Sequence, residues 1–159
     1  MKIRIISIGH IKENYLKEGI NFYLTRIKPY SDIEIVEVDD EPVKDNPSLK
    51  EIEIVKEKEG SKVIKLLKSS DYVISLDLGK KQYKSPEFAD FLMKKLDIGG
   101  SKVTFVIGGS YGLSNELKAR ANDSISLSDM TFLHQMTRLI LLEQIYRAFK
   151  ILRNEVYHK

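Results

Sequence analysis

Short apolar runs alternate with longer segments of helical spacing along all 159 residues of the chain. The runs that predict β-strands are Ile3–Ile8, Ile33–Val38, Tyr72–Leu76, Val103–Ile107 and Ser124–Leu127. Val103–Ile107 is typical of a strand that is buried on both faces of a parallel sheet. Glu34 and Glu37 interrupt the second run, so that strand is expected near an edge of the sheet.

The segments between these runs are predicted to be helices, at about residues 11–27, 46–68, 85–96, a short stretch from Ser114, and 132–152. Asn46-Pro47 marks the start of the second helix, because asparagine caps helices and proline suits the first helical position. The first helix has its apolar stripe at Ile11, Tyr15, Phe22 and Ile27. The stripe of the last helix consists of Leu133, Met136, Ile140, Leu142, Ile145, Phe149 and Leu152.

This alternation predicts an α/β protein with a mostly parallel sheet of five or six strands and helices on both faces. No repeat or linker divides the chain, so residues 1–159 are expected to form a single domain. The chain has no cysteine, and its histidines and carboxylates do not have the spacing of metal ligands, so no metal is expected. No segment approaches the roughly 20 apolar residues of a membrane span, and a cytoplasmic protein is predicted.

Positive charge is concentrated at the C-terminus. The net charge is +3, and the segment from Arg138 onward holds five basic residues and two acidic ones, so residues 1–137 sum to zero. An anionic partner near the C-terminus is one interpretation. The other is a helix end whose cations complement the helix dipole, and charge alone favours this second interpretation.

Three loops are the expected ligand site, because ligands of open parallel sheets bind beyond the carboxyl ends of the strands. These loops are Leu76–Gly79, Gly108–Gly112 and Leu127–Thr131. The glycines of the second loop have the spacing G-G-x-x-G and follow the fourth strand, unlike the dinucleotide fingerprint. A nucleotide-dependent oxidoreductase with an off-pattern glycine turn nevertheless stays an alternative.

The chain resembles the RlmH family of the SPOUT superfamily, the bacterial methyltransferases that act on N3 of a pseudouridine in large-subunit rRNA. The resemblance covers the whole length and is strongest in two segments. The first is Phe105–Leu113, and the second runs from Leu127 to His134 and continues through Arg138, Glu143-Gln144, Tyr146–Ala148 and Tyr157-His158.

The resemblance implies a C-terminal trefoil knot, a homodimer and S-adenosylmethionine as co-substrate. The residues that it implies for the cofactor site are Leu76, Gly108, Leu127, Ser128, Asp129, Met130, Thr131 and Phe132. Apolar side chains there would surround the flat adenine ring, while backbone groups of the glycine and serine loops would read its edge.

The implied acceptor is N3 of a pseudouridine in 23S rRNA, within the large subunit or the whole ribosome. That nitrogen carries a proton that must leave, so a base is needed. His158 has the near-neutral intrinsic pKa of a base, whereas Tyr157 is the weaker candidate unless a neighbouring Arg or Lys lowers its pKa, and it could instead stack on or hydrogen-bond the target base. The sequence leaves the choice between the two open. Arg138, Arg147, Arg153 and Lys159 are expected to hold phosphates. The tail is expected to reach the partner subunit's cofactor. A non-catalytic ribosome-binding module of the same fold is the remaining alternative.

Overall fold

A five-stranded sheet in the order β2-β1-β4-β3-β5 forms the centre of the computed structural model, which describes residues 1–157. Each pair of neighbouring strands is parallel. The strands are β1 (Lys2–Ile8), β2 (Asp32–Val38), β3 (Val73–Lys81), β4 (Lys102–Ile107) and β5 (Asp123–Ile125). The predicted parallel α/β class and the edge position of the second strand are thus confirmed, whereas the trefoil knot stays a prediction.

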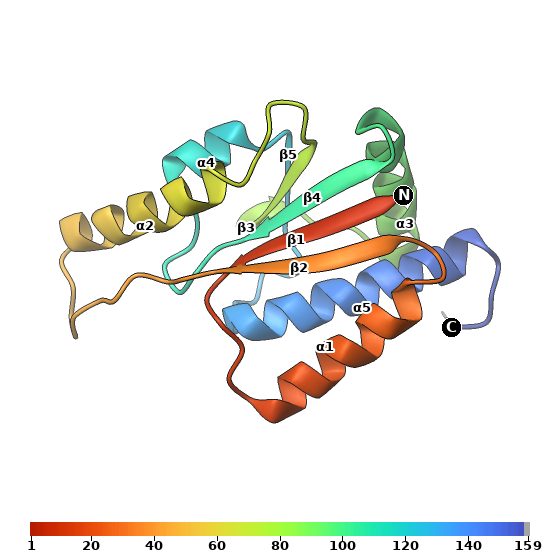
Figure 1. Cartoon of the computed structure of the whole chain (residues 1–159), viewed down its shortest axis with the longest axis horizontal. Helices are drawn as coiled ribbons and strands as arrows, with labels where there is room; N and C mark the ends of the chain where they lie inside the picture. The colour runs from red at the N-terminus through yellow and green to blue at the C-terminus, as the bar shows by residue number, and fades with distance from the viewer. Residues whose placement is uncertain (158–159) are drawn as a thin grey trace.

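Helices cover both faces of the sheet (Figure 1). One face carries α1 (Asn14–Ile27), α3 (Ser85–Ile98) and α5 (His134–Leu152), and the other carries α2 (Leu49–Ile64) and α4 (Asn115–Arg120). In the described part of the chain, no helix is both long and apolar enough to cross a bilayer.

The two faces of β1 show how the sequence builds two cores. Ile3 and Ile5 pack with the cluster under α1, α3 and α5, whereas Ile6 and Ile8 pack with the cluster under α2 and α4. Successive side chains of a strand point to opposite faces, so a strand between two helical layers must be apolar on both.

Several details of the predicted helices are wrong. Leu133, expected in the apolar stripe of α5, is 55% exposed and precedes that helix. Tyr15 and Phe22 were assigned to the core stripe of α1, but they are 60% and 47% exposed. The buried stripe instead consists of Leu16, Ile20 and Ile27. Ile11, Tyr15 and Phe22 have the same spacing of four and seven residues, so the spacing alone does not select the face of α1 that packs on the core.

The cap of α2 is also different from the prediction. Ser48 caps this helix by accepting a hydrogen bond from the Glu51 N–H. Asn46 lies before it with a φ of 51°, in the left-handed region. Asparagine tolerates that conformation better than most residues, so Asn46 forms a turn rather than the cap.

The carboxyl end of β3 departs from regular pairing and shapes the edge of the sheet. Both Leu76 and Lys81 pair with Ile125 of β5, so residues 77–80 bulge out of the ladder. This bulge places Asp77 and Leu78 at the rim of the cavity described below.

Candidate functional site

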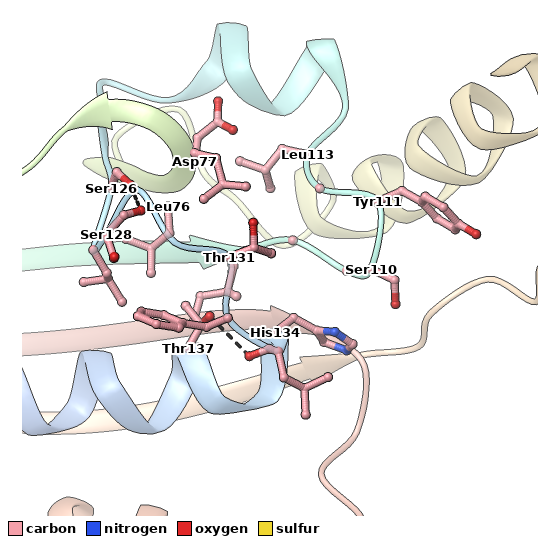
Figure 2. Close-up of a pocket in the computed structure, with 18 of the residues that line it drawn as sticks. Leu76, Asp77, Ser110, Tyr111, Leu113, Ser126, Ser128, Thr131, His134 and Thr137 are labelled. Carbon is pink, nitrogen blue, oxygen red and sulfur yellow. Dashed lines mark hydrogen bonds between the residues drawn. The ribbon is translucent and has the colours of Figure 1, made fainter.

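The loops that follow β3, β4 and β5 meet the first turn of α5 and enclose a pocket of about 610 Å³ (Figure 2). Such a volume lies within the range of about 300–1,000 Å³ that is typical of small-molecule sites. The lining combines apolar side chains, glycines and hydroxyl groups: Leu76–Leu78, Ile107–Leu113, Lys118, Ser126–Ser128, Met130–His134 and Thr137. The three loops expected from the sequence therefore do form one site.

The wall that follows β4 is a tight turn over Gly108–Gly112. The Gly112 N–H donates to the carbonyl of Gly109 at 3.0 Å. A Cβ on Gly108 would lie 2.8 Å from the carbonyl carbon of Gly112, and Gly112 itself has a φ of 87°. Only glycine suits both positions, and the result is a wall of backbone that a ligand can approach closely.

The loop after β5 is held by its own serines. Ser126 Oγ donates to the Ser128 carbonyl at 2.9 Å, and Ser128 Oγ accepts from the Met130 N–H at 3.0 Å. Met130 is 74% exposed at the mouth of the pocket. Because the serine hydroxyls serve the loop's shape, backbone groups are the main polar contacts that this loop offers a ligand.

His134 begins α5 and lines the pocket. Burial, and then the nearby Arg138 guanidinium, lower the pKa of His134, while Asp40 opposes this shift. A lowered pKa keeps the imidazole neutral over a wider pH range. The pocket therefore presents an uncharged ring at this position near neutral pH.

Arg138 lies one turn further along α5 and is 2% exposed. Its Nη1 donates to Glu37 Oε2 at 2.7 Å and its Nη2 to the Gly9 carbonyl at 3.2 Å. Burial tends to raise the pKa of Glu37, but the hydrogen bond from Arg138 helps to hold this pKa below its ordinary value. The guanidinium thus ties α5 to the ends of β1 and β2, and the phosphate contact expected of Arg138 stays a prediction.

Of the residues predicted to bind a cofactor, Leu76, Gly108, Leu127, Ser128, Met130, Thr131 and Phe132 line the pocket. Asp129 is exposed and does not line it. The lining also includes Asp77, Tyr111, Lys118 and Thr137, which were not predicted. Asp77 and Tyr111 lie inside the predicted loops, but nothing in the sequence indicates that the α4 residue Lys118 approaches Asp77, to within 3.8 Å.

Tyr157 follows the C-terminal end of α5, and its side chain folds back against the middle of that helix, whereas the pocket meets the first turn. Glu143, which the Tyr157 hydroxyl contacts, lies nine residues along α5 from His134, which is about 14 Å of helix. The Tyr157 hydroxyl donates to Glu143 Oε1 at 3.2 Å and lies 3.5 Å from the Tyr23 hydroxyl. Its ring packs edge-on against Tyr146, with centroids 4.8 Å apart.

These contacts set the protonation of Tyr157. Burial, the hydrogen bond with Tyr23 and the Glu143 carboxylate raise the pKa of Tyr157. Arg147 lies 4.8 Å from the ring, but its Nε also donates to Glu143 at 3.0 Å. A role as base requires a neighbouring cation to lower the pKa of Tyr157. The environment of Tyr157 raises this pKa instead.

Arg153 is exposed and its guanidinium lies 4.8 Å from the ring of Tyr30. His158 and Lys159, predicted as candidate base and phosphate contact, lie outside the described residues.

A family model described as "Predicted SPOUT methyltransferase" matches residues 1–158. The "Ribosomal RNA large subunit methyltransferase H" of Carboxydothermus hydrogenoformans is 52% identical over 159 residues, covering 100% of both chains. The protein of that name from Bacillus cereus (strain B4264) is 51% identical, again over 100% of both chains.

Two solved structures share the fold at low sequence identity. A probable methylase family protein from Haemophilus influenzae has a TM-score of 0.55 at 14% identity, over 99% of this chain and 70% of that one. The tRNA (m1G37) methyltransferase from Aquifex aeolicus has a TM-score of 0.54 at 12% identity, over 92% of this chain and 70% of that one.

Proposed function

The chain belongs to the family of predicted SPOUT methyltransferases, and from this premise we propose that it methylates N3 of a pseudouridine in 23S rRNA. The methyl donor is S-adenosylmethionine, and the chain acts as one domain in a homodimer on the large subunit or the assembled ribosome. The observation that carries this proposal is the pocket built from the loops after β3, β4 and β5. The rRNA target follows from the names of relatives that match the full length.

The pocket fits S-adenosylmethionine in size and chemistry. Leu76, Leu127 and Phe132 are apolar lining residues that suit an adenine ring, and the turn over Gly108–Gly112 exposes backbone to polar groups. When bound, the co-substrate supplies an electrophilic methyl group on a cationic sulfonium. The neutral imidazole of His134 suits that cation better than a charged ring would.

The tail supplies the acid–base chemistry. The acceptor nitrogen is a poor nucleophile until its proton leaves, so a base must take the proton while the new N–C bond forms. We assign this role to His158, because an imidazole ordinarily titrates near pH 6.5. Tyr157, whose pKa is raised, stays a neutral phenol that can stack on the target base or donate a hydrogen bond to it.

The distance between pocket and tail implies a composite site. Since the Tyr157 side chain is held at Glu143, nine residues along α5 from the pocket residue His134, we propose that the Tyr157-His158 tail of one subunit serves the pocket of the other. Met130 and Leu133 are 74% and 55% exposed beside the pocket mouth, as expected of apolar residues that a partner covers. Arg147, Arg153 and Lys159 are the basic residues we propose for contacts with RNA phosphates near that tail.

The test is transfer of a labelled methyl group from S-adenosylmethionine to ribosomes that lack the modification. We expect label in the large-subunit RNA with the wild-type protein. The variants Tyr157→Phe and His158→Ala should bind the co-substrate normally but transfer far less label. Co-substrate binding without label on subunits or ribosomes would refute the proposed substrate.

A further inference from the structure

Two adjacent residues of α2, Glu59 and Gly60, support the glycine turn of the pocket from behind. A Cβ built on Gly109 would lie 3.0 Å from Glu59 Oε1, so the carboxyl group occupies the space next to that glycine. A Cβ on Gly60 would lie 2.2 Å from the Oγ of Ser114. Gly109 lies within the turn, and Ser114 caps the α4 helix that follows it, so α2 touches both ends of this wall.

The carboxyl group of Glu59 is buried and only partly hydrogen-bonded. Its residue is 3% exposed. Oε2 accepts a hydrogen bond from the Glu41 N–H at 3.0 Å, but buried Oε1 has no hydrogen-bond partner among the residues that the structure describes. A buried polar atom without a partner is costly and requires an explanation.

The surroundings of Glu59 favour its neutral form. Burial raises the pKa of Glu59, and the carboxylates of Asp40 and Glu41 act in the same direction, whereas the Glu41 N–H and Lys62 oppose it. A protonated carboxylic acid can lie against the Gly109 backbone without the desolvation cost of a charge. The same group still accepts from Glu41, and so joins the loop after β2 to the pocket wall.

We infer that Glu59 is a positioning residue for co-substrate binding, which holds Gly109 in place and thereby the wall that S-adenosylmethionine contacts. Glu59 does not line the pocket, so its effect is exerted through the position of the turn. The inference rests on the proposed function, because it takes S-adenosylmethionine as the ligand of this pocket.

The experiment measures the dissociation constant of S-adenosylmethionine by calorimetry for full-length Glu59→Ala and Glu59→Gln proteins. Glutamine keeps the shape and an oxygen that can accept from Glu41, and it carries no charge at any pH. We expect Glu59→Ala to weaken binding about tenfold or more, and Glu59→Gln to stay within about twofold of the wild type. The matched control is Glu57→Ala, the same change at an exposed position of α2, which should bind as the wild type does.

A pH series separates positioning from mere structural support. Wild-type affinity should fall as rising pH ionises Glu59 through its raised pKa, and Glu59→Gln should lack that fall. This comparison decides the matter if Glu59→Ala does not fold. The inference is overturned if Glu59→Ala binds like the wild type, if glutamine is as poor as alanine, or if the two pH profiles coincide. A wild-type protein that binds no S-adenosylmethionine would instead overturn the proposed function.

Discussion

At the scale of single residues, the fold sets the charge of His134 to suit a cationic ligand. Its pKa is lowered, chiefly by burial, so the ring becomes charged only below the ordinary imidazole value of about 6.5. Protonation would place a cation beside the sulfonium. We therefore expect the affinity for S-adenosylmethionine to fall as the pH drops below that value, and His134→Gln to remove the fall.

Calorimetric titration between about pH 5 and 8 checks this prediction. His10→Gln is the control, since His10 is exposed and has its pKa raised, first by the hydrogen bond to Asp39. If the loss of affinity at low pH persists in His134→Gln but vanishes in His10→Gln, the effect belongs to His10 and the prediction is wrong.

The identity of the base is a second question at this scale. A base of ordinary imidazole pKa makes kcat rise with pH through about 6.5, because only the unprotonated ring accepts a proton. We expect His158→Ala to abolish this rise and Tyr157→Phe to retain it at lower amplitude, since the raised pKa of Tyr157 keeps its hydroxyl protonated. Single-turnover rates over a pH series distinguish the two, and the reverse pattern would make Tyr157 the base.

At the scale of elements, Gly60 shows why the sequence could predict α2 but not its packing. A glycine inside a helix ordinarily weakens it relative to alanine. Here the Cβ of alanine would lie 2.2 Å from Ser114 Oγ, and Ser114 is itself 2% exposed and caps α4. The close approach of α2 and α4 is a tertiary contact, so no local pattern in either helix indicates it.

We accordingly expect Gly60→Ala to lower the free energy of unfolding by about 1–3 kcal/mol, as overpacking does, instead of raising it. Urea denaturation followed by circular dichroism measures the change. Ser61→Ala is the matched control at the next, exposed position of the same helix, and it should leave stability nearly unchanged. Stabilisation by Gly60→Ala would mean that α2 and α4 pack less closely than described.

The same limit explains the other differences between prediction and structure. The strands and the three site loops follow from runs of apolar residues that end in glycine and serine, which are local signals. The exposed face of α1 and the burial of Arg138 beside Glu37 depend on how α5 lies against α1 and β2. Arginine at a helix surface and arginine in a buried ion pair look alike in a sequence, so the ion pair of Arg138 could not be predicted before the fold was known.

At the scale of the whole molecule, the Tyr157 side chain lies against the middle of α5 at Glu143, whereas the pocket meets the first turn of that helix, and this separation is the main reason to expect a functional dimer. A monomer with this shape could bind the co-substrate but would not bring its own Tyr157 to the methyl group while that side chain is held at Glu143. Isologous pairing of two chains would create two equivalent sites, each with a pocket from one subunit and a tail from the other. The resemblance-based prediction of a knot concerns the threading of α5 and stays a prediction.

Subunit complementation tests the composite site directly. Thr131→Arg adds a cation to the pocket at an exposed position, so it should repel the sulfonium without disturbing the fold, and His158→Ala removes the proposed base. Each variant alone should be inactive. When the two variants are co-expressed in equal amounts, half of the dimers are mixed, and each mixed dimer has one intact pocket facing one intact tail. We therefore expect about a quarter of wild-type activity. Affinity tags of two kinds isolate the mixed dimer, whose activity should be about half that of the wild type because one of its two sites is complete. If purified mixed dimers are as inactive as the parents, pocket and tail must belong to the same chain, and Tyr157 would have to leave its contacts with Glu143 and Tyr146 to reach its pocket.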